Sequence, residues 1–344
     1  MVQTLSIRRP DDWHVHFRDQ SLLQQTVPAT ALHFARALVM PNLQPPVTNL
    51  ELLLAYRERI LLAATAYPHF SPYMTFYLNE TLHPDMLFHA ASQYPFILGA
   101  KLYPAGVTTH SEQGAQSIQA LYPLLELMQT LELTLQIHGE CKTGDIFERE
   151  ALFIETELKP IVRNFPKLRI VLEHISTAVA VDYVKHASPY IAATITPQHL
   201  LYNRNQLLAG GIKPHFYCLP ILKHANDQIA LRQAACSGNP KFFAGTDSAP
   251  HERHTKENAC GCAGIYSAPY AVALYAQVFE EMHCLNHLEA FLSQFGADFY
   301  RLPYADSFIE LRKVPQQIAK SLPLADTEVI PIGAGELLNW SIYA

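Results

Sequence analysis

Charged residues, glycines and long apolar runs are all scarce in this sequence. Charged residues make up 16% of the chain, against about 25% in an average soluble protein. Together with a hydrophobic content of 49%, this low charge excludes a disordered chain. No run of about 18 apolar residues occurs, so we predict no membrane span. The stretch from Met1 to Trp13 lacks the apolar region of a secretory signal, and we therefore expect a cytoplasmic protein.

The sequence also has no excess of basic residues. Lys and Arg number 25 against 31 Asp and Glu, which gives a formal net charge of −6. No positive field is therefore available to hold nucleic acid. The six cysteines form no C-x-x-C pair, and they are scattered along a chain long enough to bury a large core without cross-links. We therefore expect free thiols in a reducing compartment.

The sequence does contain a recurring pattern of short apolar runs, each followed by a loop and a segment with helical spacing. The first run starts near Ile7 and ends at His14 and His16, and the others cover 34–40, 73–78, 96–103, 133–137, 169–172, 191–196 and 241–245. Helical spacing is clear in 50–66, 113–131 and 146–164. Eight alternating units predict a parallel sheet closed as a (β/α)8 TIM barrel of the α/β class. An open doubly wound sheet is the alternative, but no G-x-G-x-x-G motif follows the first strand.

A length of 344 residues allows either two domains or one large barrel. We expect one domain over residues 1–344, with a barrel core at about 5–320 and a short C-terminal extension at 321–344. The connection between the seventh and eighth predicted strands, from Pro197 to Pro240, is long for a barrel. It is expected to carry a helix and a loop over the site.

Polar residues stand at the ends of the predicted strands, where barrel enzymes place their chemistry. Two positions i and i+2 on a strand face the same side, so His14 and His16 can converge on one cation. Taken alone, they could also be two histidines on an exposed edge. The candidate metal ligands are His14, His16, Lys101, His138, His174 and Asp247. A set of four histidines and an aspartate at one rim favours a metal site.

Asp247 and Lys101 each have competing interpretations. A carboxylate directly after a buried strand is costly unless it is paired or metal-bound, so Asp247 is a candidate ligand or general base; the alternative is a helix N-cap or turn residue. Lys101, inside an apolar strand, could extend to the rim or form a Schiff base as in barrel aldolases. Its amine could also react with CO₂ to give a carbamate that bridges two metals. The surrounding histidines favour the carbamate.

Two further polar residues follow the first two strands. Arg18 follows the histidine pair, and its planar guanidinium suits a carboxylate. Asn42 offers both a donor and an acceptor; the alternatives are a surface arginine and a turn asparagine. Two divalent cations with one carbamate, one carboxylate and a hydroxide keep a positive charge, which favours an anionic substrate. Neutral histidines with a carboxylate suit zinc, although Mn and Co also fit.

The segments Asp12–Arg18 (DWHVHFR) and Gly245–His251 (GTDSAPH), with Lys101, His138 and His174 between them, resemble the dihydroorotases. The resemblance is to the short stand-alone bacterial class (class II) in the amidohydrolase superfamily, and it covers nearly the whole chain. Gln20 departs from it, since the family usually has a small residue such as glycine there.

The resemblance implies a role for each matching residue. His14, His16 and Asp247 would hold one Zn²⁺, His138 and His174 would hold a second, and Lys101 as N6-carboxylysine would bridge them. The implied substrate contacts are Arg18, Asn42, His138 and His251, together with the backbone of Leu219 and Ala263. Thr108 and Thr109 would lie on a mobile loop, residues 106–112, that closes on the substrate; on the residues alone, this pair reads as an ordinary polar loop.

The implied reaction is the reversible interconversion of N-carbamoyl-L-aspartate with (S)-dihydroorotate and water in de novo pyrimidine (UMP) biosynthesis. A hydroxide between the two metals would attack the ring amide, with Asp247 as general base and then acid. The resemblance also implies a homodimer. Another binuclear amidohydrolase such as a hydantoinase is the main alternative, but its neutral substrate would leave Arg18 unpaired. A Schiff-base aldolase and a non-catalytic metal-binding scaffold are the others.

Overall fold

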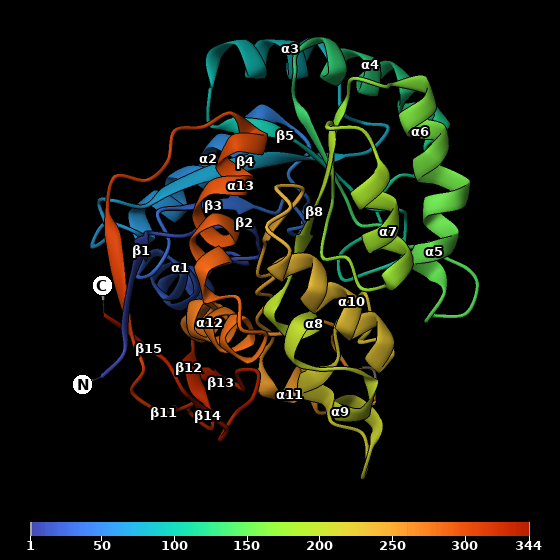
Figure 1. Cartoon of the computed structure of the whole chain (residues 1–344). Helices are drawn as coiled ribbons and strands as arrows, with labels where there is room; N and C mark the ends of the chain where they lie inside the picture. The colour runs from blue at the N-terminus through green and yellow to red at the C-terminus, as the bar shows by residue number, and fades with distance from the viewer. Residues whose placement is uncertain (1, 260, 344) are drawn as a thin grey trace.

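The computed structural model describes residues 2–259 and 261–343, and its centre is a parallel sheet that closes into a barrel (Figure 1). Its eight strands are β2 (Asp11–Val15), β3 (Arg36–Val39), β4 (Ser71–Leu78), β5 (Ile97–Leu102), β6 (Thr134–Ile137), β7 (Arg169–Leu172), β8 (Ile191–Ile195) and β9 (Phe242–Ala244), paired in that order. The ring is completed where Asp247 N donates to His14 O (2.8 Å) and His16 N donates to Ser248 O (3.0 Å). The predicted (β/α)8 TIM barrel is confirmed.

Helices follow the strands and surround the sheet (Figure 1). Those up to β8 are α1 (Leu23–Ala31), α2 (Leu50–Ala63), α3 (Pro84–Gln93), α4 (Tyr122–Thr130), α5 (Arg149–Phe153), α6 (Lys159–Asn164) and α7 (Ala178–His186). The long connection before β9 holds α8 (Pro197–Leu201), α9 (Arg204–Leu208) and α10 (Ala225–Cys236), which is more than the one helix predicted. After β9 come α11 (Arg253–Lys256), α12 (Ala271–Glu281) and α13 (Phe295–Tyr300).

Two predicted helices are interrupted or shortened. The pattern at 146–164 gives α5, a π-helical turn at Ile154–Leu158 and then α6. Pro160 lies two residues after the end of that wide turn, and its ring nitrogen cannot donate a helical hydrogen bond. The pattern at 113–131 gives α4 only from Tyr122, because Gln116 N and Ser117 N donate instead to the Glu80 carboxylate (2.9 and 3.0 Å).

The prediction of one continuous strand from Ile7 to the histidine pair is wrong. The structure divides it into β1 (Thr4–Arg8) and β2, separated at Arg9 and Pro10. β1 lies outside the barrel and pairs antiparallel with β10 (Phe308–Arg312), which in turn pairs with β15 (Ser341–Tyr343). Proline lacks the N–H that a continuous strand would use, which explains the break.

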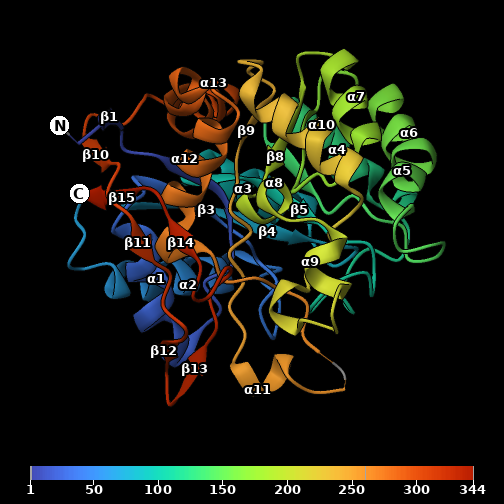
Figure 2. The ribbon, with the colours of Figure 1, turned by 60° about the horizontal axis from the view of Figure 1, so that its bottom comes forward.

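Short strands also form most of the C-terminal part, which begins with β10, before the predicted start at residue 321. β11 (Gln316–Gln317) pairs with β14 (Leu337–Leu338), and β12 (Leu322–Leu324) pairs with β13 (Thr327–Val329). Figure 2 shows the β12–β13 hairpin and α11 at one edge of the molecule. An ion pair between Arg253 of α11 and Glu328 of β13 joins them (2.8 Å).

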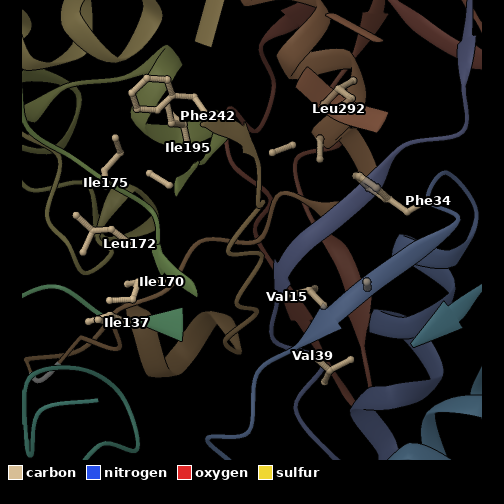
Figure 3. Packing of buried hydrophobic residues seen from close by; sticks show 14 of the residues in the cluster. Val15, Phe34, Val39, Ile137, Ile170, Leu172, Ile175, Ile195, Phe242 and Leu292 are labelled. Atoms are coloured by element: carbon tan, nitrogen blue, oxygen red, sulfur yellow. The ribbon is translucent and has the colours of Figure 1, made fainter. Parts of the chain in front are cut away.

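The core lies mainly between the strands and the helices. Strand side chains such as Val15, Val39 and Leu172 pack in one large buried cluster (Figure 3), and burying each such side chain contributes about 1.5–3 kcal/mol. The strands approach closely at Gly99 of β5, where a Cβ would lie 1.8 Å from Thr134 O. Glycine is therefore required for the β5–β6 pairing, which helps fix the position of the next residues of β5.

The expectation of free thiols is wrong for one pair, because Cys236 and Cys284 form a disulfide with Cα atoms 5.8 Å apart. They are 48 residues apart in sequence, and only the docking of α10 beside the end of α12 brings them together. Cys141, Cys218 and Cys262 are free, and Cys260 lies outside the described residues. Among the described residues, no helix has the length and apolar character needed to cross a bilayer.

Candidate active site

The six predicted metal ligands come together at the carboxyl-terminal end of the barrel. They lie on, or up to three residues after, five strands of the sheet: β2, β5, β6, β7 and β9. The exposed fraction of each is 9% or less: His14, His16, Lys101, His138, His174 and Asp247. Residues spread over more than 230 positions therefore share one buried region.

His14, His16 and Asp247 form a tight cluster. Their candidate ligand atoms all lie within 4.8 Å of one another. The two Nε2 atoms are 3.2 Å apart, and Asp247 Oδ1 lies 3.4 Å from that of His14 and 3.1 Å from that of His16. Two imidazole nitrogens and a carboxylate oxygen facing one point are a donor set that fits a divalent cation such as zinc.

His138 and His174 lie beside this cluster. Their ring centroids are 4.8 Å apart, and the ring of His174 lies 5.0 Å from that of His14. Two of these histidines have a carboxylate beside one ring nitrogen. Glu140 Oε2 is 2.9 Å from His138 Nε2, and Glu173 Oε2 is 2.9 Å from His14 Nδ1. Metal-binding histidines commonly have such a carboxylate partner, which fixes the ring and leaves the other nitrogen for the metal.

Lys101 is fully buried, which excludes the interpretation that it extends to the rim. Its Nζ has no hydrogen-bond partner within the described residues. Burial lowers the pKa of Lys101 to about 8, while the nearby carboxylates of Glu173 and Asp247 oppose the shift. A buried ammonium without hydrogen bonds is costly, so the position suits an amine that has been converted to another ligand group.

Three site residues have a backbone conformation that is uncommon for non-glycine residues. Arg18, His174 and Asp247 have φ values of 61°, 42° and 46°. Such left-handed conformations cost about 1–3 kcal/mol and persist where the surroundings enforce them, often at functional sites. Gln20, where the family usually has a small residue, also has a positive φ, of 55°.

Sequence reasoning missed the carboxylate that fixes the Asp247 turn. Asp12 Oδ1 accepts hydrogen bonds from Thr246 N (2.8 Å) and His14 N (3.2 Å), and its Oδ2 accepts one from Thr246 Oγ1 (2.6 Å). Burial raises the pKa of Asp12 to about 7, although the hydrogen bonds that its carboxylate accepts act to lower it. The signal that identified Asp247, a carboxylate in an apolar strand region, also applies to Asp12 and Glu173.

A small cavity opens beside the cluster. Its lining includes most of the residues predicted to bind metal or substrate, together with Tyr103, Ala249 and Gly264. The predicted residues in the lining are His16, Arg18, Asn42, Thr108, Thr109, His138, His174, Leu219, Asp247 and Ala263. His14, Lys101 and His251 are not part of this lining.

Arg18 lines the part of this cavity that suits an anion, and His251 contacts Arg18 there. Arg18 Nη2 lies 2.8 Å from His251 Nε2, and Arg18 Nε donates to Pro250 O (3.0 Å). The same His251 nitrogen lies 3.0 Å from Ala263 O. One ring nitrogen cannot both accept from Arg18 and donate to Ala263. A carboxylate placed here would accept from the guanidinium and remove this conflict.

The predicted loop, residues 106–112, lies over the cavity. Thr109 Oγ1 donates to Ala263 O (3.0 Å), and Asn42 Nδ2 donates to Thr109 O (3.1 Å). His110 Nδ1 lies 3.3 Å from Asn42 O. These contacts join the loop to two other walls of the cavity. That the loop moves stays a prediction.

Comparisons with known proteins place this site in a family context. Residues 11–307 match the family model described as "Amidohydrolase family". A dihydroorotase from Yersinia enterocolitica is 53% identical over 344 residues, covering 99% of each chain. The crystal structure of dihydroorotase from Saccharomyces cerevisiae in complex with 5-fluoroorotic acid has a TM-score of 0.92 and 36% identity, with 99% of each chain covered. The L-hydantoinase of Arthrobacter aurescens, at 14% identity and a TM-score of 0.78 over 98% of this chain and 83% of its own, shares the fold.

Proposed function

The chain belongs to the amidohydrolase family and, within it, to the dihydroorotases, and from this membership we propose that it interconverts N-carbamoyl-L-aspartate with (S)-dihydroorotate and water in de novo pyrimidine (UMP) biosynthesis. One observation carries the proposal. His16 and Asp247 line the cavity, and so does Arg18. The guanidinium of Arg18 has no carboxylate within ion-pair distance among the described residues. Both compounds are anions that would supply this carboxylate.

The residues of the site fit two zinc ions. His14, His16 and Asp247 would hold one, His138 and His174 would hold the other, and Lys101 as N6-carboxylysine would bridge them. The short distances within the first group and the unpartnered Nζ of Lys101 support this assignment. When bound, zinc supplies Lewis acidity, which makes water nucleophilic near neutral pH and polarises a carbonyl.

Asp247 is proposed to move the proton during the reaction. Burial by itself would raise the pKa of Asp247, but the hydrogen bond from His16 and the charges of His14, His16 and Lys101 outweigh it and lower the pKa to about 2. The carboxylate is therefore ionised at neutral pH, as a proton acceptor must be. We propose that it accepts a proton from the attacking water and returns it to the ring nitrogen as the ring C–N bond breaks. In the direction of ring closure, the same steps run in reverse.

The remaining walls of the cavity are proposed to hold the substrate. Arg18, Asn42 and His251 would bind its carboxylate, with His138 at the reacting end. The backbone of Leu219 and Ala263 would contact the ring amide, and Thr108 and Thr109 would cover it. Each of these residues lines the cavity or, for His251, contacts a residue that does.

We also propose that residues 1–344 act as one catalytic domain, in the cytoplasm and as a homodimer. The proposal rests on the similarity to the dihydroorotases over the full length of the chain. The substrate is a small anion in each direction, and neither nucleic acid nor a membrane is part of the reaction.

The proposed function is tested on the purified chain by metal analysis and by assays in both directions. We expect about two zinc ions per chain, as a two-metal site requires. We also expect turnover of dihydroorotate and of N-carbamoyl-aspartate that is lost after chelation and restored by zinc. A hydantoinase would instead open neutral hydantoin rings and leave dihydroorotate untouched, and that result would contradict the proposal.

Replacing Arg18 with methionine is expected to weaken substrate binding. Loss of the charged fork should lower kcat/KM on the order of 100-fold, mostly through KM, because charge-assisted hydrogen bonds to a carboxylate are lost. Zinc content should stay at the wild-type level. Arg59→Met is the matched control, since Arg59 pairs with Asp19 at the surface (2.8 Å) and should leave KM unchanged. Wild-type KM in Arg18→Met would remove Arg18 from the substrate site.

A further inference from the structure

Lys256 is a buried lysine close to the cavity that has no role in the chemistry described above. It ends the short helix α11, after the segment that carries Asp247 and His251, and its side chain is 3% exposed. Its Nζ donates to three backbone carbonyls: Tyr217 O (3.0 Å), Cys262 O (2.9 Å) and Gly264 O (2.6 Å). An ammonium has three N–H donors, so all of them are used.

These three carbonyls belong to two segments far apart in sequence. Tyr217 precedes Leu219 in the long connection before β9, whereas Cys262 and Gly264 stand on either side of Ala263. The segments also contact each other directly, because Gly264 N donates to Tyr217 O (3.0 Å). Lys256 therefore fastens together the two backbone segments that line the cavity at Leu219 and Ala263.

Among the described residues, carbonyl dipoles and no carboxylate balance the charge of Lys256. Within the described residues, no carboxylate lies within ion-pair distance of its Nζ, and burial lowers its pKa to about 8. The titratable groups that face it are Cys218, Cys262, Arg18 and His251, none of which is a carboxylate. A buried ammonium without a counterion is expensive to keep. Keeping one behind the wall that contains Arg18 is consistent with an anionic ligand.

We propose that Lys256 is a positioning residue for the substrate, which fixes the Leu219 and Ala263 segments at the separation that the substrate ring requires. The inference rests on the proposed function, because it assigns the backbone of those two residues to the ring amide. Lys256 does not touch the reacting atoms. Its loss should therefore affect how the substrate is held more than how fast the held substrate reacts.

Lys256→Met removes the donors and the charge while it keeps the length of the side chain. We expect KM for dihydroorotate to rise on the order of 10-fold, since several hydrogen bonds to one charged group are lost. The value of kcat should stay within about threefold of wild type, and zinc content should not change. Hydrogen exchange measured by mass spectrometry should become faster in peptides containing 217–219 and 262–264.

Lys241→Met is the matched control. Lys241 directly precedes β9, at the opposite end of the barrel, and its Nζ donates to Val184 O (3.1 Å) and to Ala187 O at the end of α7. Its loss should lower the melting temperature while KM and hydrogen exchange around the cavity stay at wild-type levels. If Lys256→Met fails to fold, Lys256→Gln keeps two neutral donors and should show a smaller rise in KM.

The outcomes separate this inference from the proposed function. If the unaltered, zinc-loaded chain turns over neither compound, the proposed function is wrong, and this substrate-positioning role falls with it. Hydrogen exchange then still decides whether Lys256 holds the two segments together. If the unaltered chain is active and Lys256→Met has a wild-type KM, or shows only the loss of melting temperature seen for Lys241→Met, Lys256 is a structural residue and the inference is overturned.

Discussion

Lys101→Ala is expected to lose both metal ions and to lower kcat/KM on the order of 1,000-fold or more, because the electrostatic stabilisation of the transition state is removed with the metals. The expectation rests on geometry. Lys101 is fully buried beside His14, Asp247 and Glu173, and its Nζ has no hydrogen-bond partner among the described residues. Metal analysis and assays in both directions measure the two losses.

The carbamate adds two outcomes that an ordinary buried lysine would not produce. Small carboxylates such as acetate or propionate should restore part of the metal binding and activity of Lys101→Ala, by filling the space of the missing group. Reloading the metal-free wild-type chain with zinc should be slower in CO₂-depleted buffer than with bicarbonate. Lys241→Ala serves as the control, since that lysine bonds carbonyls at the far end of the barrel. A fully active Lys101→Ala with two zinc ions would exclude the bridging role.

The sequence predicted the barrel well, because its strands are buried on both sides. Such strands are near-continuous apolar runs, and the run at 169–172 has the same bounds as β7. The errors came from places where a proline or a side-chain hydrogen bond interrupts the regular backbone hydrogen bonds that the pattern predicts. Pro10 divided the first strand, Pro160 follows a π-helical turn in a predicted continuous helix, and Glu80 captured the backbone N–H groups at Gln116 and Ser117.

The candidate metal ligands could be predicted because each one follows or ends a strand, and strand ends converge in a barrel. The ligand that each supporting carboxylate contacts could not be predicted in this way. The contact of Glu140 with His138 and that of Glu173 with His14 depend on side-chain directions that a pattern does not contain. The left-handed backbone at His174 and Asp247 was equally invisible, since histidine and aspartate adopt it more often than most residues but far less often than glycine.

Asp247→Asn is expected to separate metal binding from proton transfer. The amide has the same shape as the carboxylate, and its oxygen can still face His14 and His16, so most of the zinc should remain bound. It cannot take up the proton of the attacking water, so kcat should fall by about 10²–10⁴-fold in both directions. Asp247→Ala should lose activity and zinc together.

Asp11→Asn provides the matched control on the strand next to β9. Asp11 is also a buried carboxylate, but it pairs with Arg36 at the other end of β2 (Oδ1 to Nε, 2.7 Å). Removing its charge should lower the melting temperature, because the Arg36 guanidinium loses its partner, while kcat per folded chain stays near wild type. If Asp247→Asn keeps both its zinc and a near-wild-type kcat, another group must carry the proton. Asp247 would then be a metal ligand alone.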